Sequence, residues 1–330
     1  MKYSTDYFFD ILYSMRDCKK LSDIDNADDF AAECEAKRTA LTKALGLDKI
    51  KAIGTEMTYS RISEKQFDME ILPKLVTPVW ILRPNHSNGK TILYLPGHDS
   101  YGARGSFNYY GQNQTFHKWL PLQLQGEGYT VVIPELIGFG EVINEGYGEK
   151  HNGCYANTEM LLMYGITMAG MRMYQVQCAI KLAEEVTGKP VTGLYGISGG
   201  ALVAAVLAAL DHSFESVVIS NYGATFKSSI MAMHHCVDNY IPGLLNIGEI
   251  SDILGLIAPT PLMITNGEHD TIFPNEGVLI TEKELQKIYD TADAGDALYC
   301  HNHSGAHETN SDAVIKFYDS FLPKARKKMA

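Results

Sequence analysis

The fold is decided by the run Val191-Thr-Gly-Leu-Tyr-Gly-Ile-Ser-Gly-Gly-Ala201. This run predicts a short apolar strand, a sharp turn at Ser198 and a helix that starts near Ala201, which is the context of a G-x-S-x-G motif. The glycines at 196 and 200 would let strand and helix pass closely while the turn lifts the serine oxygen above the strand end. Ser198 is therefore the predicted nucleophile.

The segment after this turn favours the catalytic interpretation over a plain Gly/Ser-rich turn. Residues 202–210 are nearly all apolar and include small residues, as expected for a helix in the middle of an α/β sandwich. The Gly199 N–H would lie at the start of that helix, where it can bind a developing oxyanion.

The composition and net charge of the chain limit the kinds of molecule that it can bind. The 330-residue chain has 45% hydrophobic and 20% charged residues, as in ordinary globular proteins. Its net charge of −11 disfavours nucleic acid and anionic membranes, since both need clustered Lys and Arg. The N-terminus shows no signal-peptide pattern, no apolar run could span a bilayer, and the six cysteines are scattered without a C-x-x-C. We expect a cytoplasmic protein with free thiols.

Strands and helices alternate along most of the chain. The expected strands are 54–61, 66–71, 77–82, 90–95, 129–134, the strand into Ser198, 215–220, 261–265 and 297–300. The expected helices start near residue 5 and cover about 28–45, 157–187, the segment up to 210, 275–290 and 308–321. This alternation predicts a mostly parallel, doubly wound α/β sheet with antiparallel N-terminal strands.

The domain prediction is one catalytic domain over residues 51–330, preceded by an N-terminal helical extension over residues 1–50. The helices of this extension could pack on an edge of the sheet or form a contact in a homo-oligomer.

A serine nucleophile needs a base and an orienting acid, which on this topology follow Ser198 in the order acid, then His. Each should lie in a loop at the carboxyl end of a later strand. We assign Asp270, after the strand at 261–265, as the acid and His307, after the next strand, as the base.

Other assignments fit the same pattern. The acid could be Glu268 or Asp238, and the base could be His301, His303 or His269. Asp270 could instead cap the following turn, and His307 could merely start a helix.

The second oxyanion donor should come from the loop Pro96-Gly97-His98-Asp99. Gly97 allows a close backbone approach, so the His98 N–H is the expected partner of the Gly199 N–H. The Asp99 side chain could face the pocket. The alternative is a plain glycine turn.

A long loop at 221–248 should overhang the site, because it follows the strand after Ser198. Its residues Tyr222, His234 and Tyr240 are candidates for substrate binding. The Met and aromatic residues of this loop could equally be core packing.

Histidines raise the question of a metal. Either His301-Asn-His303 with His307, or the run His234-His235-Cys236, could bind zinc. Neither group has a familiar zinc-ligand spacing, and Ser198 explains His307 better, so no metal or cofactor is expected.

With these residues in place, the chain resembles the α/β-hydrolase superfamily, and more narrowly its acetyl-xylan-esterase and dienelactone-hydrolase-like branch. The resemblance runs from about residue 50 to 323. It rests on the ordered motifs Gly196-Ile-Ser-Gly-Gly200, Asn239-Tyr-Ile-Pro-Gly243, Leu256-Ile-Ala-Pro-Thr-Pro-Leu262, Asn266-Gly-Glu-His-Asp270-Thr-Ile-Phe-Pro274 and Gly305-Ala-His307-Glu308.

The resemblance implies the α/β-hydrolase fold, the triad Ser198, Asp270 and His307, and no cofactor. The chain departs from the branch in one loop. The branch usually has His-Gly-His-Gly where this chain has Pro96-Gly97-His98-Asp99.

The expected function is hydrolysis of small acetyl or similar esters, including acetylated sugars, through an acyl-enzyme. The same machinery also serves peptidases, thioesterases and hydrolases of C–C bonds, because fold does not decide function. A non-catalytic ligand-binding protein and a metal-dependent hydrolase are the alternatives from other classes.

Overall fold

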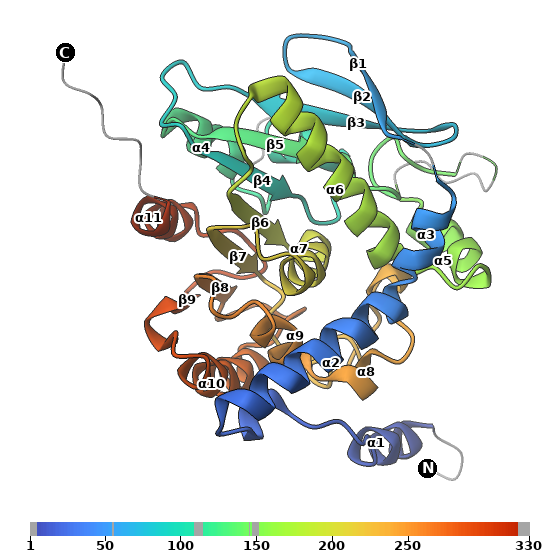
Figure 1. Cartoon of the computed structure of the whole chain (residues 1–330), viewed down its shortest axis with the longest axis vertical. Coiled ribbons are helices and arrows are strands. Elements are labelled where there is room, and N and C mark those ends of the chain that lie inside the picture. Colours follow the sequence, from blue (N-terminus) through green and yellow to red (C-terminus); the bar gives the residue numbers. More distant parts are fainter. Residues whose placement is uncertain (1–4, 55, 109–114, 145, 147–151, 323–330) are drawn as a thin grey trace.

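The computed structural model describes residues 5–54, 56–108, 115–144, 146 and 152–322. Within these ranges, nine strands form one sheet in the order β1-β2-β3-β5-β4-β6-β7-β8-β9 (Figure 1). The strands are β1 Thr58–Arg61, β2 Gln66–Leu72, β3 Leu75–Leu82, β4 Thr91–Leu95, β5 Thr130–Pro134, β6 Gly193–Ile197, β7 Ser216–Ser220, β8 Leu262–Gly267 and β9 Leu298–His303.

Pairing in the sheet changes direction at β3. Strands β1, β2 and β3 pair antiparallel, and β3 also pairs antiparallel with β5. From β5 to β9 every pair is parallel, and all residues of β4 to β8 are buried. Burial on both faces explains why these strands read as continuous apolar runs. The predicted mixed α/β sheet with antiparallel N-terminal strands is confirmed.

Helices cover both faces of the sheet and enclose two cores. One core includes α6 Met168–Thr187, α7 Gly199–Leu210, α9 Ile250–Gly255 and α10 Asn275–Thr291. The other includes α4 Leu120–Gly126 and α11 Ser311–Phe321. Among the described residues, no helix has both the length and the apolar character needed to cross a bilayer.

The N-terminal helices α1 Asp6–Ser14, α2 Ala27–Leu45 and α3 Leu47–Ala52 precede the sheet, as expected. Helix α2 lies across the helices of the first core (Figure 1) and buries Leu41 and Leu45 completely there. Gly46 ends α2 in a left-handed conformation with φ 74°. Thus α2 packs on the helical layer rather than along a sheet edge. The division of the chain at residue 50 stays a prediction.

The expected single helix over 157–187 is wrong, because the chain forms two helices there. Helix α5 spans Cys154–Met163, and α6 starts only at Met168. Between them Gly165 has φ 68°, and the Thr167 side chain accepts a hydrogen bond from the Gly170 N–H. A glycine stop followed by a threonine cap therefore separates the two helices.

Two further boundaries differ from the sequence expectation. Strand β9 continues through His301 and His303, so these histidines belong to the strand and not to the loop after it. The last helix starts at Ser311 rather than at residue 308, because the Asn310 side chain caps it at the Ala313 N–H. The loop over 221–248 also contains the short helices η4 Val237–Asn239 and α8 Leu244–Ile247.

Candidate active site

Ser198 occupies a strained turn between β6 and α7. Its φ of 54° and ψ of −125° lie in a region that non-glycine residues rarely adopt. A Cβ added at Gly196 would lie 2.6 Å from the Gly200 carbonyl oxygen, and one at Gly200 would lie 2.3 Å from the Leu95 carbonyl oxygen. Only glycine fits these two positions, as the motif predicts.

The Ser198 turn opens into a cavity of about 510 Å³. His307 lines the same cavity, so the predicted nucleophile and base face one space. The other lining residues are His98, Phe116, Asn152, Gly199, Met233, His234, His235, Cys236, Asn239, Ile272 and Phe273. In the described part of the chain, no hydrogen bond joins Ser198 to His307. Such bonds often tighten only when substrate binds.

Asp270 holds the His307 ring. The His307 Nδ1 lies 2.8 Å from Asp270 Oδ2, which also accepts a hydrogen bond of 3.0 Å from Asn221 Nδ2. The other oxygen, Oδ1, accepts from the backbone N–H groups of Ile272 and Phe273 at 2.8 and 3.0 Å. With Nδ1 directed at the carboxylate, Nε2 is the nitrogen left to act as a base.

The environment of Asp270 keeps it ionised. Burial alone would raise the pKa of this carboxyl, but the hydrogen bond and charge of His307 and the amide of Asn221 hold the pKa below its ordinary value. Asn221 has φ 52°, and sequence reasoning missed it. Its place directly after β7, at the same sheet edge as the other site loops, is the signal that could have found it.

The competing acids and bases lie elsewhere. Glu268 and His269 are exposed, and His301 and His303 lie on β9 outside the cavity wall. Asp238 is buried beside His98 instead of His307.

The loop after β4 lies against the Ser198 turn. A Cβ at Gly97 would lie 3.0 Å from Ser198 Cβ, and one at Gly199 would lie 2.7 Å from Cε1 and Nδ1 of His98. Gly199 is the first residue of α7, so its N–H has no acceptor within the helix. In the described part of the chain, no acceptor bonds the His98 N–H either. Within the described residues, both predicted oxyanion donors therefore lack a protein acceptor, and their two residues are neighbours in space.

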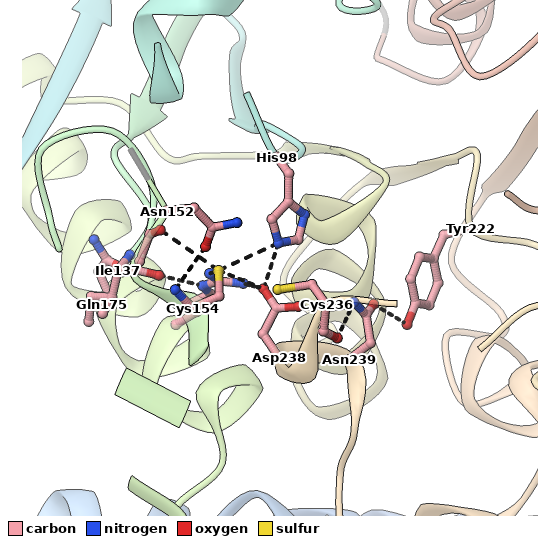
Figure 2. A network of polar contacts seen from close by, with 11 residues as sticks. His98, Ile137, Asn152, Cys154, Gln175, Tyr222, Cys236, Asp238 and Asn239 are labelled. Atoms are coloured by element: carbon pink, nitrogen blue, oxygen red, sulfur yellow. Dashed lines mark hydrogen bonds and ion pairs between the residues drawn. The ribbon is translucent and has the colours of Figure 1, made fainter. Parts of the chain in front are cut away.

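The His98 side chain belongs to a buried polar network (Figure 2). Its Nε2 lies 2.9 Å from Asp238 Oδ2 and 3.5 Å from Cys154 Sγ. Arg172, in α6, donates to Asp238 Oδ2 at 2.5 Å and to Cys154 Sγ at 3.2 Å. The side chains of Arg172 and Asp238 are 2% and 1% exposed, so this ion pair is shielded from solvent.

Charges in this network shift two pKa values in opposite directions. Burial would raise the pKa of Asp238, but the charges of Arg172 and His98 hold it well below its usual range. Burial would lower the pKa of His98, yet the Asp238 carboxylate outweighs it and raises the pKa to about 9. Sequence reasoning missed Arg172, whose signal is a lone cation between Met171 and Met173 in an otherwise apolar helix segment.

Comparison with known proteins supports the fold that this geometry indicates. No family model matches the sequence. A Bacillus subtilis (strain 168) protein named "Putative hydrolase YtaP" is 28% identical over 253 residues, covering 72% of this chain and 80% of its own length. A Bacteroides fragilis structure described as a "putative acetyl xylan esterase" superposes with TM-score 0.76 at 14% identity, covering 98% of this chain and 96% of that one.

The chain has the α/β-hydrolase fold. A second structure with this likeness is a glucuronoyl esterase of carbohydrate esterase family 15 from Caldicellulosiruptor kristjansonii, with TM-score 0.63 and 14% identity, covering 90% of this chain and 86% of that one. In this chain, Ser198, Asp270 and His307 all lie at the carboxyl edge of the parallel strands, after β6, β8 and β9.

The residues expected to bind substrate divide into two groups. His234 lines the Ser198 cavity, and its Nε2 lies 3.0 Å from the hydroxyl of Tyr155. Asp99 lines a smaller adjoining cavity of about 150 Å³ together with His98. One Asp99 oxygen accepts a hydrogen bond of 2.8 Å from the Tyr101 N–H, so part of this carboxylate holds its own loop.

Tyr222 and Tyr240 are not among the described residues that line the Ser198 cavity, and their expected role in substrate binding stays a prediction. Tyr222 is 1% exposed, donates to Asn239 Oδ1 at 3.0 Å and packs on Phe273, with ring centroids 4.7 Å apart. It is therefore core packing behind the cavity wall. Tyr240 lines a different cavity next to α1, and its hydroxyl donates to the Ile230 carbonyl.

Replacing Arg172 with methionine is expected to lower the free energy of unfolding by about 3–5 kcal/mol, because it leaves Asp238 buried without its main partner. Urea unfolding followed by circular dichroism measures this. Lys181→Met, at an exposed position of the same helix, is the control and should change stability by less than about 0.5 kcal/mol. Equal stability of wild type and Arg172→Met would contradict the proposed pairing.

The Glu135 side chain is buried against the loop after β4. Its ionisation makes the free energy of unfolding depend on pH. It is 2% exposed, and one of its oxygens accepts a hydrogen bond of 2.8 Å from the Ala103 N–H. Burial raises the pKa of Glu135 from 4.5 to about 8. The folded protein therefore binds this proton more tightly than the unfolded chain, and the free energy of unfolding falls as pH rises between these two values.

Glu135→Gln is expected to remove this pH dependence, because the amide keeps an acceptor for Ala103 and carries no charge. Relative to wild type, the variant should gain about 4 kcal/mol in free energy of unfolding between about pH 5 and about pH 9. Urea unfolding at the two pH values measures the gain. The exposed Glu159, changed to Gln, should leave the wild-type pH dependence intact, and a wild-type profile for Glu135→Gln would refute the assignment.

Proposed function

We propose that this chain is a serine hydrolase that cleaves carboxylic esters through Ser198, His307 and Asp270. One observation carries the proposal. The strained turn at Ser198 opens into the cavity that His307 lines, and Asp270 fixes the ring of that histidine by Nδ1. A strained serine and a histidine oriented by a carboxylate are the parts that acyl transfer requires.

In the proposed reaction, Ser198 Oγ attacks the ester carbonyl carbon while His307 Nε2 takes the serine proton. The N–H groups of Gly199 and His98 bind the resulting oxyanion. His307 then gives its proton to the alcohol oxygen as the C–O bond breaks, which leaves an acyl-serine. Water deprotonated by His307 attacks this intermediate and releases the acid. Asp270 stabilises the imidazolium at both steps, and no cofactor is needed.

The cavity favours a small acyl group joined to a polar alcohol. Its wall combines aromatic and aliphatic side chains, such as Phe116 and Ile272, with amide and imidazole groups, such as Asn152 and His234. Apolar surface suits an acetyl or similar group, and the polar groups can bind hydroxyls of a sugar. The esterase descriptions of structural neighbours with the same fold support this substrate class.

A substrate panel tests the proposed function. We expect wild-type protein to hydrolyse small acetyl esters, including acetylated sugars, with a kcat/KM at least about tenfold above that for long-chain esters, matched thioesters and aminoacyl amides. A preference for amides or thioesters would replace the esterase assignment by a peptidase or thioesterase. Tight ester binding without turnover would indicate a ligand-binding protein.

A further inference from the structure

Four possible metal ligands converge next to the oxyanion loop. They are His98 after β4, Cys154 at the start of α5, and Cys236 and Asp238 at η4. Their ligand atoms all lie within 4.8 Å of one another, although the chain separates them by as many as 140 positions, from 98 to 238. Figure 2 shows the imidazole, the two sulfurs and the carboxylate directed at a common centre. We propose that His98, Cys154, Cys236 and Asp238 bind a zinc ion.

The distances fit tetrahedral coordination. Zinc bonds of about 2.3 Å to sulfur and about 2.0–2.2 Å to nitrogen and oxygen imply edges of roughly 3.3–3.8 Å between ligand atoms. The structure has 2.9 Å from His98 Nε2 to Asp238 Oδ2, 3.5 Å from the same nitrogen to Cys154 Sγ, and 3.3 Å from Cys154 Sγ to Asp238 Oδ2. These three atoms would need shifts of no more than about half an ångström to reach such edges, and Cys236 Sγ, which lies within 4.8 Å of each of them, would complete the site by moving inward.

The donor set and its surroundings select zinc. Two thiolates with an imidazole and a carboxylate are a soft-to-borderline set that favours zinc in tetrahedral geometry. Two thiolates and one carboxylate carry three negative charges, which one Zn²⁺ and the buried Arg172 together balance. Arg172 contacts Cys154 and Asp238, and Asn239 donates to the second Asp238 oxygen at 2.9 Å, so the ligands have the outer partners expected of a metal site.

The site is closed by protein but reachable from the cavity. His98 and Cys236 line the Ser198 cavity, whereas Cys154 and Asp238 are buried behind them. An ion could enter from the cavity, and four protein ligands would then fill its tetrahedral coordination, as in structural zinc sites. Its role would be to fix His98, and with it the oxyanion loop, to α5 and η4. This inference concerns a different site from the proposed triad and does not depend on esterase activity.

A hydrogen-bonded network without metal is the alternative explanation. A protonated His98 can share Asp238 with Arg172, which accounts for the two short contacts to the carboxylate. These two contacts to the carboxylate involve neither sulfur, yet the structure brings two free thiols to the same point. The alternative predicts no specific zinc affinity, so binding separates the two explanations.

The experiment is zinc binding by the untagged 330-residue chain. Wild type is dialysed against zinc and then against metal-free buffer, the bound metal is counted by mass spectrometry, and the Kd is obtained by competition with a chromophoric chelator. We expect about one zinc per chain in wild type. Cys236→Ser, at a half-buried position that should tolerate the change, is expected to weaken binding by more than about 100-fold, since losing an outer-shell partner alone costs 10–100-fold. Cys300→Ser, on exposed β9, should bind like wild type.

Cobalt substitution provides a second readout. Co²⁺-loaded wild type should show the thiolate-to-cobalt charge-transfer absorption of two sulfur ligands, and Cys236→Ser only that of one. The inference is overturned if folded wild type retains no zinc, or if wild type and Cys236→Ser bind it equally. A wild-type chain that is two hydrogens lighter, with Cys154 joined to Cys236 and no metal bound, would also overturn it.

Discussion

Ser198→Ala is expected to lower kcat for p-nitrophenyl acetate by roughly 10⁵–10⁶-fold, because loss of the nucleophile in such a triad costs about as much as loss of all three residues. The remaining oxyanion donors and the cavity would still bind the ester, so KM should change little. Steady-state kinetics, corrected for the spontaneous hydrolysis of the ester without enzyme, measures both constants.

The matched control for this change is Ser213→Ala. Ser213 is exposed and lies before β7, at the opposite edge of the sheet from Ser198, so its variant should keep wild-type kinetics. In the backbone conformation of residue 198, alanine is strained to the same extent as serine. We therefore expect both variants to have the same free energy of unfolding as wild type. Wild-type turnover by a folded Ser198→Ala protein would end the serine-hydrolase proposal.

Asp270→Asn is expected to lower kcat by about 10⁴-fold while the fold is kept. Asparagine has a single acceptor oxygen, which would stay with the backbone N–H groups of Ile272 and Phe273, so its NH2 group would face His307 Nδ1 in place of Oδ2. The His307 ring would then favour the tautomer with its proton on Nε2, which cannot accept the serine proton. Steady-state kinetics measures the loss of activity, and circular dichroism checks the fold.

Glu268→Gln is the control for Asp270→Asn, because Glu268 is a carboxylate in the same loop that is exposed and outside the cavity. It should keep nearly full activity. If Glu268→Gln lost activity and Asp270→Asn did not, the acid would be misassigned.

The fold could be predicted because its signals are local. The buried strands β4 to β8 are unbroken apolar runs, and the alternation with helices leaves few arrangements other than a parallel sheet. The break between α5 and α6 could not be placed, since a glycine within an apolar helical pattern is often tolerated and the decisive cap at Thr167 is a single side chain. The capping of α11 by Asn310 was missed for the same reason.

The candidate site was partly predictable. Ser198, Asp270 and His307 could be proposed because each follows a strand of one parallel sheet, and such strand ends meet at one edge. Their chemical roles stay predictions.

Contacts of the side chains made the rest hard to predict. The network of His98, Cys154, Arg172 and Asp238 joins four separate segments of the chain, and no sequence spacing indicates it. The direction of the Tyr222 side chain could not be predicted, because a residue after β7 can point to the cavity or behind its wall, and the hydroxyl of Tyr222 has a buried partner in Asn239.

The measurement that tests the central claim most directly is the intact mass of wild type and Ser198→Ala after incubation with a fluorophosphonate. The reagent bonds through phosphorus to a serine oxygen and releases fluoride, and it reacts readily only with a serine that a base has activated. We predict one adduct on wild type, mapped to Ser198, and none on Ser198→Ala. An unmodified wild-type protein that is folded, or equal labelling of both proteins, would contradict the account.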